Sequence, residues 1–197
     1  MTKFYLTGGL GNRLITFFSM YGLADLYWTP YIESPTFFGL PDLPEADPQG
    51  TPLRVWRGEE GSFCGPCVRP FGDLESRYEI LIKQHREGMF QPFYAVSEFP
   101  CVAYHFRRTD WPYARAESIC WRLITRTSLI FTDDKEIHET ATSRGMTSFL
   151  GDAKCPIKTK YDHETMSKCS LIVSDTQSSY SLTAAIAGRK RIMKYES

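Results

Sequence analysis

The sequence predicts an α/β protein with parallel sheets, and two patterns carry that prediction. Between residues 101 and 195, short runs rich in β-branched and aromatic residues alternate with segments of helical periodicity. Near the amino terminus, a strand-like run at residues 3–7 leads through a glycine cluster into an amphipathic helix. Strands that alternate with helices are joined by right-handed crossovers, which make the strands parallel. With 197 residues, of which 42% are hydrophobic, the chain can bury a sizeable core.

The first half of the chain has a short regular part and a long irregular part. Apolar residues recur after the glycines at the spacing of one helical face, namely Leu14, Phe17, Phe18 and Tyr21. Residues 28–70 hold eight of the twelve prolines and no sustained period, so we expect irregular structure with one short strand at 53–56. A second amphipathic helix is expected over 71–88. The irregular segment is a candidate wall for binding an acceptor substrate.

The second half is regular, and it defines a second domain. The expected strands are 101–106, 128–132, 146–150, 171–175 and 191–195, and the expected helices are 114–126, 135–144, 163–169 and 180–187. We therefore place one domain at residues 1–98 and another at residues 99–197. Ligands of parallel sheets bind beyond the carboxyl ends of the strands, so the chemistry is expected there.

Composition excludes several classes of partner and location. Basic and acidic residues number 23 each, so no overall field attracts nucleic acid or an anionic membrane surface. No apolar run approaches the 18 residues of a membrane span, and strand-like sequence begins too early for a signal peptide, so we expect a cytoplasmic protein. Cys101, Cys120 and Cys169 lie in apolar patterns, where cysteine behaves as a small hydrophobe.

The strand at 101–106 ends in a candidate anion site. His105, Arg107, Arg108 and Asp110 follow one another at its carboxyl end. An arginine side chain matches phosphate oxygens with two parallel charge-assisted hydrogen bonds. Neighbouring strand residues point to opposite faces, so we expect one arginine to face the ligand and the other to be structural.

Polar residues also follow two further strands. Asp133 and Asp134 come after the strand at 128–132, where they either cap the next helix or accept hydrogen bonds from a ligand's ring or ribose groups. After 171–175, hydroxyl residues gather at another helix start, namely Thr176, Ser178, Ser179 and Ser181. One hydroxyl suffices for a cap, so the others are candidate ligand contacts.

The glycine cluster resembles a phosphate-binding loop without matching a standard fingerprint. Gly8, Gly9 and Gly11 precede a helix, but Leu14 stands where the dinucleotide pattern needs its last glycine. Together with the three strand ends, this loop carries a family resemblance. In this order, GGLGNRL, HFRRTD, FTDD and SDTQSSYS resemble the motifs of the fucosyltransferase superfamily, which includes α1,2-, α1,6- and protein O-fucosyltransferases.

The resemblance implies a GT-B fold, in which two Rossmann-like halves with parallel sheets face a cleft, here with an abbreviated N-terminal half. It implies an inverting glycosyltransferase without metal or other cofactor, which transfers fucose from GDP-fucose to a glycan hydroxyl. One of Arg107 and Arg108, with Arg107 as the first choice, would neutralise the departing β-phosphate. The implied donor contacts are Gly9, Gly11, Asn12, Arg13, His105, Arg108, Asp133, Asp134, Ser178, Ser179, Tyr180 and Ser181.

Several points stay open at the level of sequence. The transfer needs a general base. The resemblance to the α1,6-type relatives implies an acidic residue a few positions after the arginines, and Glu117 and then Asp110 are the candidates. No carboxylate and histidine cluster at ligand spacing indicates a metal. The alternatives are another GDP-sugar as donor, or a binding module for nucleotide sugars or glycans without catalysis. A thiol oxidoreductase built on Cys64 and Cys67 is a weaker rival, because GEEGS precedes the pair and Val-Arg-Pro follows it.

Overall fold

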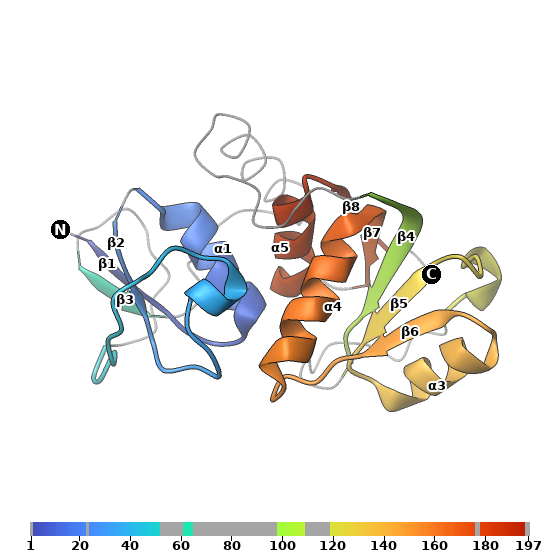
Figure 1. Cartoon of the computed structure of the whole chain (residues 1–197), viewed down its shortest axis with the longest axis horizontal. Coiled ribbons are helices and arrows are strands. Elements are labelled where there is room, and N and C mark those ends of the chain that lie inside the picture. The colour runs from blue at the N-terminus through green and yellow to red at the C-terminus, as the bar shows by residue number, and fades with distance from the viewer. Residues whose placement is uncertain are drawn as a thin grey trace. The chain divides into compact units, whose positions relative to one another are not determined.

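The structure is a computed structural model that describes residues 2–22, 24–51, 61–64, 98–108, 119–175 and 178–195. The chain divides into two compact units, Met1–Phe93 and Tyr94–Ser197. Each unit contains a parallel sheet with at least one helix (Figure 1). This confirms the predicted α/β class with two parallel sheets.

The first unit is built on a small sheet in the order β2-β1-β3. Its strands are β1 (Lys3–Leu6), β2 (Asp25–Trp28) and β3 (Ser62–Cys64), and both pairings are parallel. Helix α1 (Leu10–Met20) and the 3₁₀ helix η1 (Thr36–Phe38) complete the described part of this unit. Sequence reasoning missed β2 and β3, because four and three residues are too few to show an alternating pattern.

The glycine loop joins β1 to α1. Gly8 has a φ of 78°, and a Cβ there would lie 3.0 Å from the side-chain nitrogen of Asn12, so this position requires glycine. Gly9 is the N-cap of α1, which begins at Leu10, earlier than expected from the sequence. Gly11 and Asn12 therefore belong to the first helical turn rather than to the loop.

The second unit contains a sheet in the order β6-β5-β4-β7-β8, with every pairing parallel. Its strands are β4 (Phe99–Phe106), β5 (Leu129–Thr132), β6 (Thr147–Leu150), β7 (Cys169–Ser174) and β8 (Arg191–Lys194). The chain thus builds outward from β4 in one direction, then returns to add β7 and β8 on the other side. The carboxyl ends of β4 and β7 form the switch point where open α/β sheets bind ligands.

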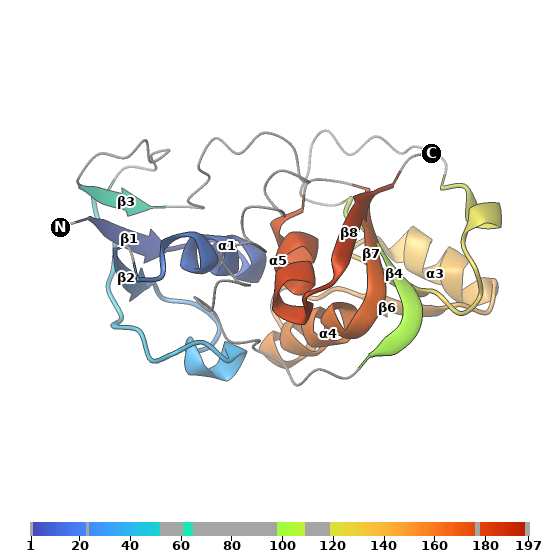
Figure 2. The ribbon, with the colours of Figure 1, turned by 90° about the horizontal axis from the view of Figure 1, so that it is seen from above.

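Helices cover both faces of this sheet (Figure 2). Helices α4 (Pro156–Lys168) and α5 (Ser179–Gly188) lie on one face, and α3 (Lys135–Ser143) lies on the other. Under α3, an apolar cluster joins β4, β5 and the segment after η3 (Trp121–Leu123); it consists of Phe106, Ile124, Ile130, Ala141 and Met146. The site residues at the strand ends therefore stand on a well-packed sheet.

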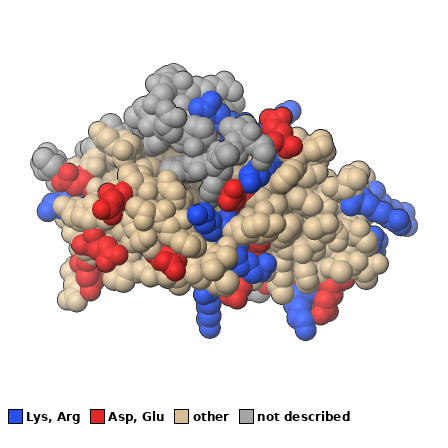
Figure 3. All heavy atoms as spheres, viewed as in Figure 1, with Lys and Arg blue, Asp and Glu red and all other residues tan. Residues whose placement is uncertain are grey.

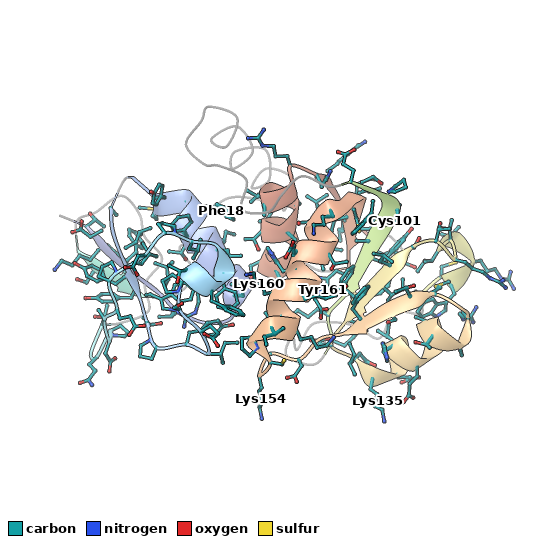
Figure 4. All side chains as sticks on the ribbon, viewed as in Figure 1. Phe18, Cys101, Lys135, Lys154, Lys160 and Tyr161 are labelled. Atoms are coloured by element: carbon teal, nitrogen blue, oxygen red, sulfur yellow. The ribbon has the colours of Figure 1, made fainter. Side chains whose placement is uncertain are left out.

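Two predicted helices need correction. A helix was predicted over 114–126. The structure describes this segment from residue 119 onward, and that part contains only the short η3 turn. Helix α4 begins at Pro156 rather than at residue 163, with the proline in its first turn. Its first turns were missed because Ile157 and Tyr161 are 71% and 59% exposed, which breaks the amphipathic pattern. Tyr161 lies on α4 (Figure 4). The strand predicted at 53–56 and the helix predicted at 71–88 lie outside the described residues.

The surface carries no dominant charge on the face seen in Figure 3, where side chains of both signs are separated by uncharged surface. This agrees with the net charge of zero. Among the described residues, no helix is both long enough and apolar enough to cross a membrane. In the same part of the chain, histidine, cysteine and acidic side chains form no group of three that could hold a metal ion.

Candidate functional site

The candidate site lies at the carboxyl end of β4, the central strand of the second unit. His105 pairs in register with Phe131 of β5 on one side and with Ser174 of β7 on the other. The sheet therefore brings together three segments that are far apart in sequence. These segments, which begin at Arg107, Asp133 and Asp175, are the ones that the sequence singled out.

Two aspartates hold the backbone of the arginine pair. The N–H of Arg107 donates to Oδ1 of Asp175 at 3.2 Å, and the N–H of Arg108 donates to Oδ1 of Asp133 at 2.7 Å. The N–H of Asp175 donates in turn to the carbonyl of His105 at 3.2 Å. The segment that carries both guanidinium groups is thus fixed from β5 and from β7.

Asp175 is a residue of the candidate site that sequence reasoning missed. Its Oδ2 also lies 4.0 Å from Nε of Arg108, and both side chains are 12% exposed. Burial raises the pKa of Asp175 to about 6, against the N–H of Arg107 and the charge of Arg108, while Asp133 raises it further. The available signal was its position directly after a buried strand, in the run LIVSD.

The two aspartates after β5 have different structural roles. Asp134 is the N-cap of α3, where its Oδ1 accepts the N–H groups of Glu136 at 2.8 Å and Ile137 at 3.1 Å. The capping alternative therefore holds for Asp134. Asp133 instead accepts the hydrogen bond from Arg108, which makes it part of the arginine segment. Contacts of either residue with guanine or ribose stay a prediction.

The hydroxyl residues at the start of α5 are partly used by the fold. Ser178 caps the helix by accepting the N–H of Tyr180 at 3.3 Å. Ser181 is fully buried and donates to Oγ of Ser174 at 3.0 Å. Ser179 and Tyr180 are partly exposed, in the first turn of the helix beyond the end of β7. Pyrophosphate binding by this turn stays a prediction.

Two histidines lie close to Tyr180, in the first turn of α5. The ring of His105 is 5.8 Å from that of Tyr180, and the ring of His163, on α4, is 4.9 Å from the same tyrosine. Nε2 of the fully buried His163 hydrogen-bonds Oγ1 of Thr183 at 3.0 Å. Burial, together with His105, lowers the pKa of His163 to about 3, so it is neutral at pH 7. Its role is to join α4 to α5 beneath the site.

In the first unit, Arg13 supports the glycine loop. Its guanidinium donates to the carbonyls of Gly8 at 2.8 Å, Thr29 at 3.1 Å and Pro30 at 3.3 Å. It also stacks against Trp28 and Tyr31, with 4.6 and 4.1 Å to the ring centroids, and the residue is 3% exposed. These contacts give Arg13 a structural role, and its contact with a donor stays a prediction. Donor contacts of Gly9, Gly11 and Asn12 stay predictions.

Some candidate residues lie outside the described part of the chain. These are Asp110 and Glu117, the candidate bases, with Thr176 and Cys67. Cys64 ends β3, so a short strand does precede it, contrary to the expectation from GEEGS. The redox alternative at Cys64 and Cys67 therefore stays open.

Comparison with known proteins gives one structural similarity. No family model matches the sequence, and no curated protein matches it. Among solved structures, the chain is similar to a crystal structure of NodZ α-1,6-fucosyltransferase soaked with GDP-fucose. The two chains are 10% identical with a TM-score of 0.48, over 94% of this chain and 92% of that one. The strand order defines an α/β protein with a Rossmann-type sheet in its second unit.

Proposed function

We propose that the chain is a metal-independent inverting glycosyltransferase with GDP-fucose as donor and a glycan hydroxyl as acceptor. The observation that carries this proposal is the fixed Arg107-Arg108 segment at the switch point of the second sheet. Asp133 and Asp175 hold its backbone N–H groups from the two neighbouring strands. The four sequence motifs support fucose as the sugar and guanosine diphosphate as the leaving group.

The chemistry requires stabilisation of a diphosphate as its negative charge develops. A guanidinium about 4 Å from a phosphate charge contributes roughly 4 kcal/mol at an effective dielectric near 20. Donors that are already oriented need no reorganisation during the reaction, which makes them effective without a metal. In this proposal Arg107 is the catalytic cation, and the aspartates position it through the backbone.

The remaining donor contacts follow from the same arrangement. Ser179 and Tyr180 begin α5 beside the carboxyl end of β7, where helical N–H groups favour an anion. His105 lies next to Tyr180 and would contact the nucleotide. Glu117, with Asp110 as the second choice, would deprotonate the acceptor hydroxyl.

The test begins with nucleotide binding. Thermal shifts with GDP, UDP, ADP and CDP should show stabilisation by GDP, and stabilisation by UDP alone would contradict the fucose assignment. Release of GDP from GDP-fucose is then followed with a set of glycan acceptors. GDP binding without any transfer would indicate the alternative of a binding module.

Arg107→Ala is the decisive variant. Loss of one preorganised donor to the leaving group costs about 2.7 to 4 kcal/mol of barrier, so transfer should fall by a factor of about 10² to 10³. Arg122→Ala, at an exposed position on η3, is the matched control and should retain wild-type activity. Unchanged transfer by the Arg107 variant would show that Arg107 does not stabilise the leaving diphosphate.

A further inference from the structure

A pair of thiols lies at the opposite end of the second sheet from the arginine segment. Cys101 lies on β4 (Figure 4). Its Sγ is 3.5 Å from Sγ of Cys169, the first residue of β7. Both are free thiols, and 68 positions of sequence separate them. From their apolar surroundings both residues are predicted to be small hydrophobes, and only the strand pairing brings the two sulfurs together.

The two sulfur atoms lie close enough to be joined by a disulfide. β4 and β7 are adjacent and parallel, and the register shifts by a bulge between Phe99 and Val102, which is where Cys101 lies. The hydroxyl of Ser170 donates to the carbonyl of Cys101 at 2.9 Å, which fixes the two strands beside the pair. A disulfide needs a sulfur separation of about 2.05 Å, which small side-chain rotations can reach from 3.5 Å.

We propose that Cys101 and Cys169 form a reversible disulfide site with a low-molecular-weight disulfide such as oxidised glutathione as the oxidant. The thiolate of Cys101 attacks one sulfur of the oxidant, forms a mixed disulfide and releases one glutathione thiolate. The thiolate of Cys169 then attacks Sγ of Cys101 and displaces the second glutathione. Two protein thiols are oxidised and one glutathione disulfide is reduced to two thiols, with each protein proton passing to a released thiolate.

The order of these two steps follows from exposure. Cys101 is half-buried and can meet the oxidant, whereas Cys169 is fully buried. Burial, with a further contribution from Cys101, raises the pKa of the Cys169 thiol well above its usual range. The thiolate fraction of Cys169 is therefore small at neutral pH, and the second step depends on pH.

The charged groups around Cys169 do not reverse this order. Lys190, between α5 and β8, lowers the pKa of Cys169 by a smaller amount than burial raises it. Its Nζ is paired with Glu98 at 2.8 Å, so its charge is partly compensated. On the side of α4, the thiol meets the carbonyl of Thr165. Ring closure should accelerate by about tenfold for each pH unit as the thiolate fraction rises.

The disulfide would tie together the two strands that meet at the switch point. Its loop of 68 residues includes β5, α3, β6 and α4, and a link that closes so long a loop constrains the unfolded chain strongly. The oxidised form should melt at least about 5 °C above the reduced form.

The experiment uses the full chain with Cys64→Ser and Cys67→Ser, so that the CGPC cysteines contribute no signal. The protein is equilibrated with oxidised glutathione, the remaining thiols are alkylated, and non-reducing peptide mass spectrometry locates the linkage. At least about half of the chains should carry the Cys101–Cys169 peptide, lighter by two hydrogen atoms, and reduction with dithiothreitol should reverse it.

Variants separate this linkage from unspecific oxidation. Cys101→Ala removes the half-buried partner and should abolish the linked peptide, whereas Cys155→Ser, on a half-buried cysteine outside the pair, should retain it. Cys169→Ala is a second test from the buried side, and circular dichroism shows whether each variant folds. Free Cys101 and Cys169 thiols at equilibrium in the folded protein would overturn the proposal, as would a linkage to Cys120 or Cys155.

Discussion

At the scale of single residues, Asp175 combines a functional position with a cost in stability. Its folded pKa of about 6 lies above the ordinary value of 3.8. Its contribution to stability is therefore complete below pH 3.8 and is lost as the pH rises through 6. At pH 7 the buried carboxylate is kept charged at a cost of about 3 kcal/mol, on the order of 1.36 kcal/mol for each pKa unit. Asp175 therefore lowers stability at neutral pH while it holds the N–H of Arg107.

The first prediction concerns Asp175→Asn. The amide oxygen can still accept the N–H of Arg107 but carries no charge, so the variant should melt above the wild type at pH 7 and equal it near pH 4. Transfer should fall nonetheless, because the side chain of Arg108 loses its anionic neighbour. Asp47→Asn, on an exposed aspartate of the first unit, is the control for melting at both pH values. An equal stability difference at pH 4 and pH 7 would contradict the assigned pKa.

The second residue prediction concerns His163. Its folded pKa of about 3 lies below the ordinary 6.5, so the unfolded chain takes up the proton first and stability is lost as the pH falls below 6.5. Between pH 6 and pH 4, the free energy of unfolding of the wild type should fall by about 2 kcal/mol more than that of His163→Gln, because glutamine does not titrate. Denaturant unfolding measures the difference. At pH 7.5, the difference in unfolding free energy between the two proteins reports the hydrogen bond to Thr183. Unfolding free energies that change with pH in parallel for the two proteins would refute the assigned pKa of His163.

At the scale of elements, α4 and α5 approach so closely that the last helical residue of α5 must be glycine. A Cβ at Gly188 would overlap the backbone carbonyl of Ser167. Alanine ordinarily stabilises a helix relative to glycine by about 1 kcal/mol, but here we expect Gly188→Ala to destabilise by about 1 to 3 kcal/mol. Gly151→Ala is the control, because its nearest contact outside its own neighbours is an ordinary 3.5 Å to the carbonyl of Thr132. A stabilised Gly188 variant, measured by thermal melting, would show that the two helices can separate.

A second contact between elements supports the glycine loop. Arg13 of α1 donates hydrogen bonds to carbonyl groups that directly follow β2. Arg13→Lys keeps the charge but loses the planar stacking on Trp28 and Tyr31, and an ammonium cannot reach all three carbonyls. We expect a loss of about 2 kcal/mol, since hydrogen bonds from charged groups contribute about 1.5 to 3 kcal/mol. Thermal melting of Arg13→Lys beside Arg126→Lys, an exposed control, tests this. Equal melting temperatures would mean that the loop does not rely on the guanidinium.

At the scale of the whole molecule, each parallel sheet gathers distant segments at the carboxyl ends of its strands. In the second unit this edge carries Arg107, Asp133 and Asp175, while the thiol pair lies toward the other end of β4 and β7. The proposed donor site and the proposed disulfide thus lie at opposite ends of the same two strands. The proposed disulfide would raise the stability of the fold and would leave the covalent structure of the arginine segment unchanged.

The sequence by itself determined the α/β class, the parallel character of the sheets and the segments that hold the candidate site. Local periodicity and strand-end polarity are sufficient for these, because they depend on residues close together in the chain. Tertiary structure alone decided what each polar side chain does: Asp134 caps a helix, Asp133 and Asp175 hold the arginine backbone, and Arg13 supports a loop. It also brought Cys101 to Cys169. These outcomes depend on strand order, register and burial, which are set only when segments distant in the sequence pack against one another.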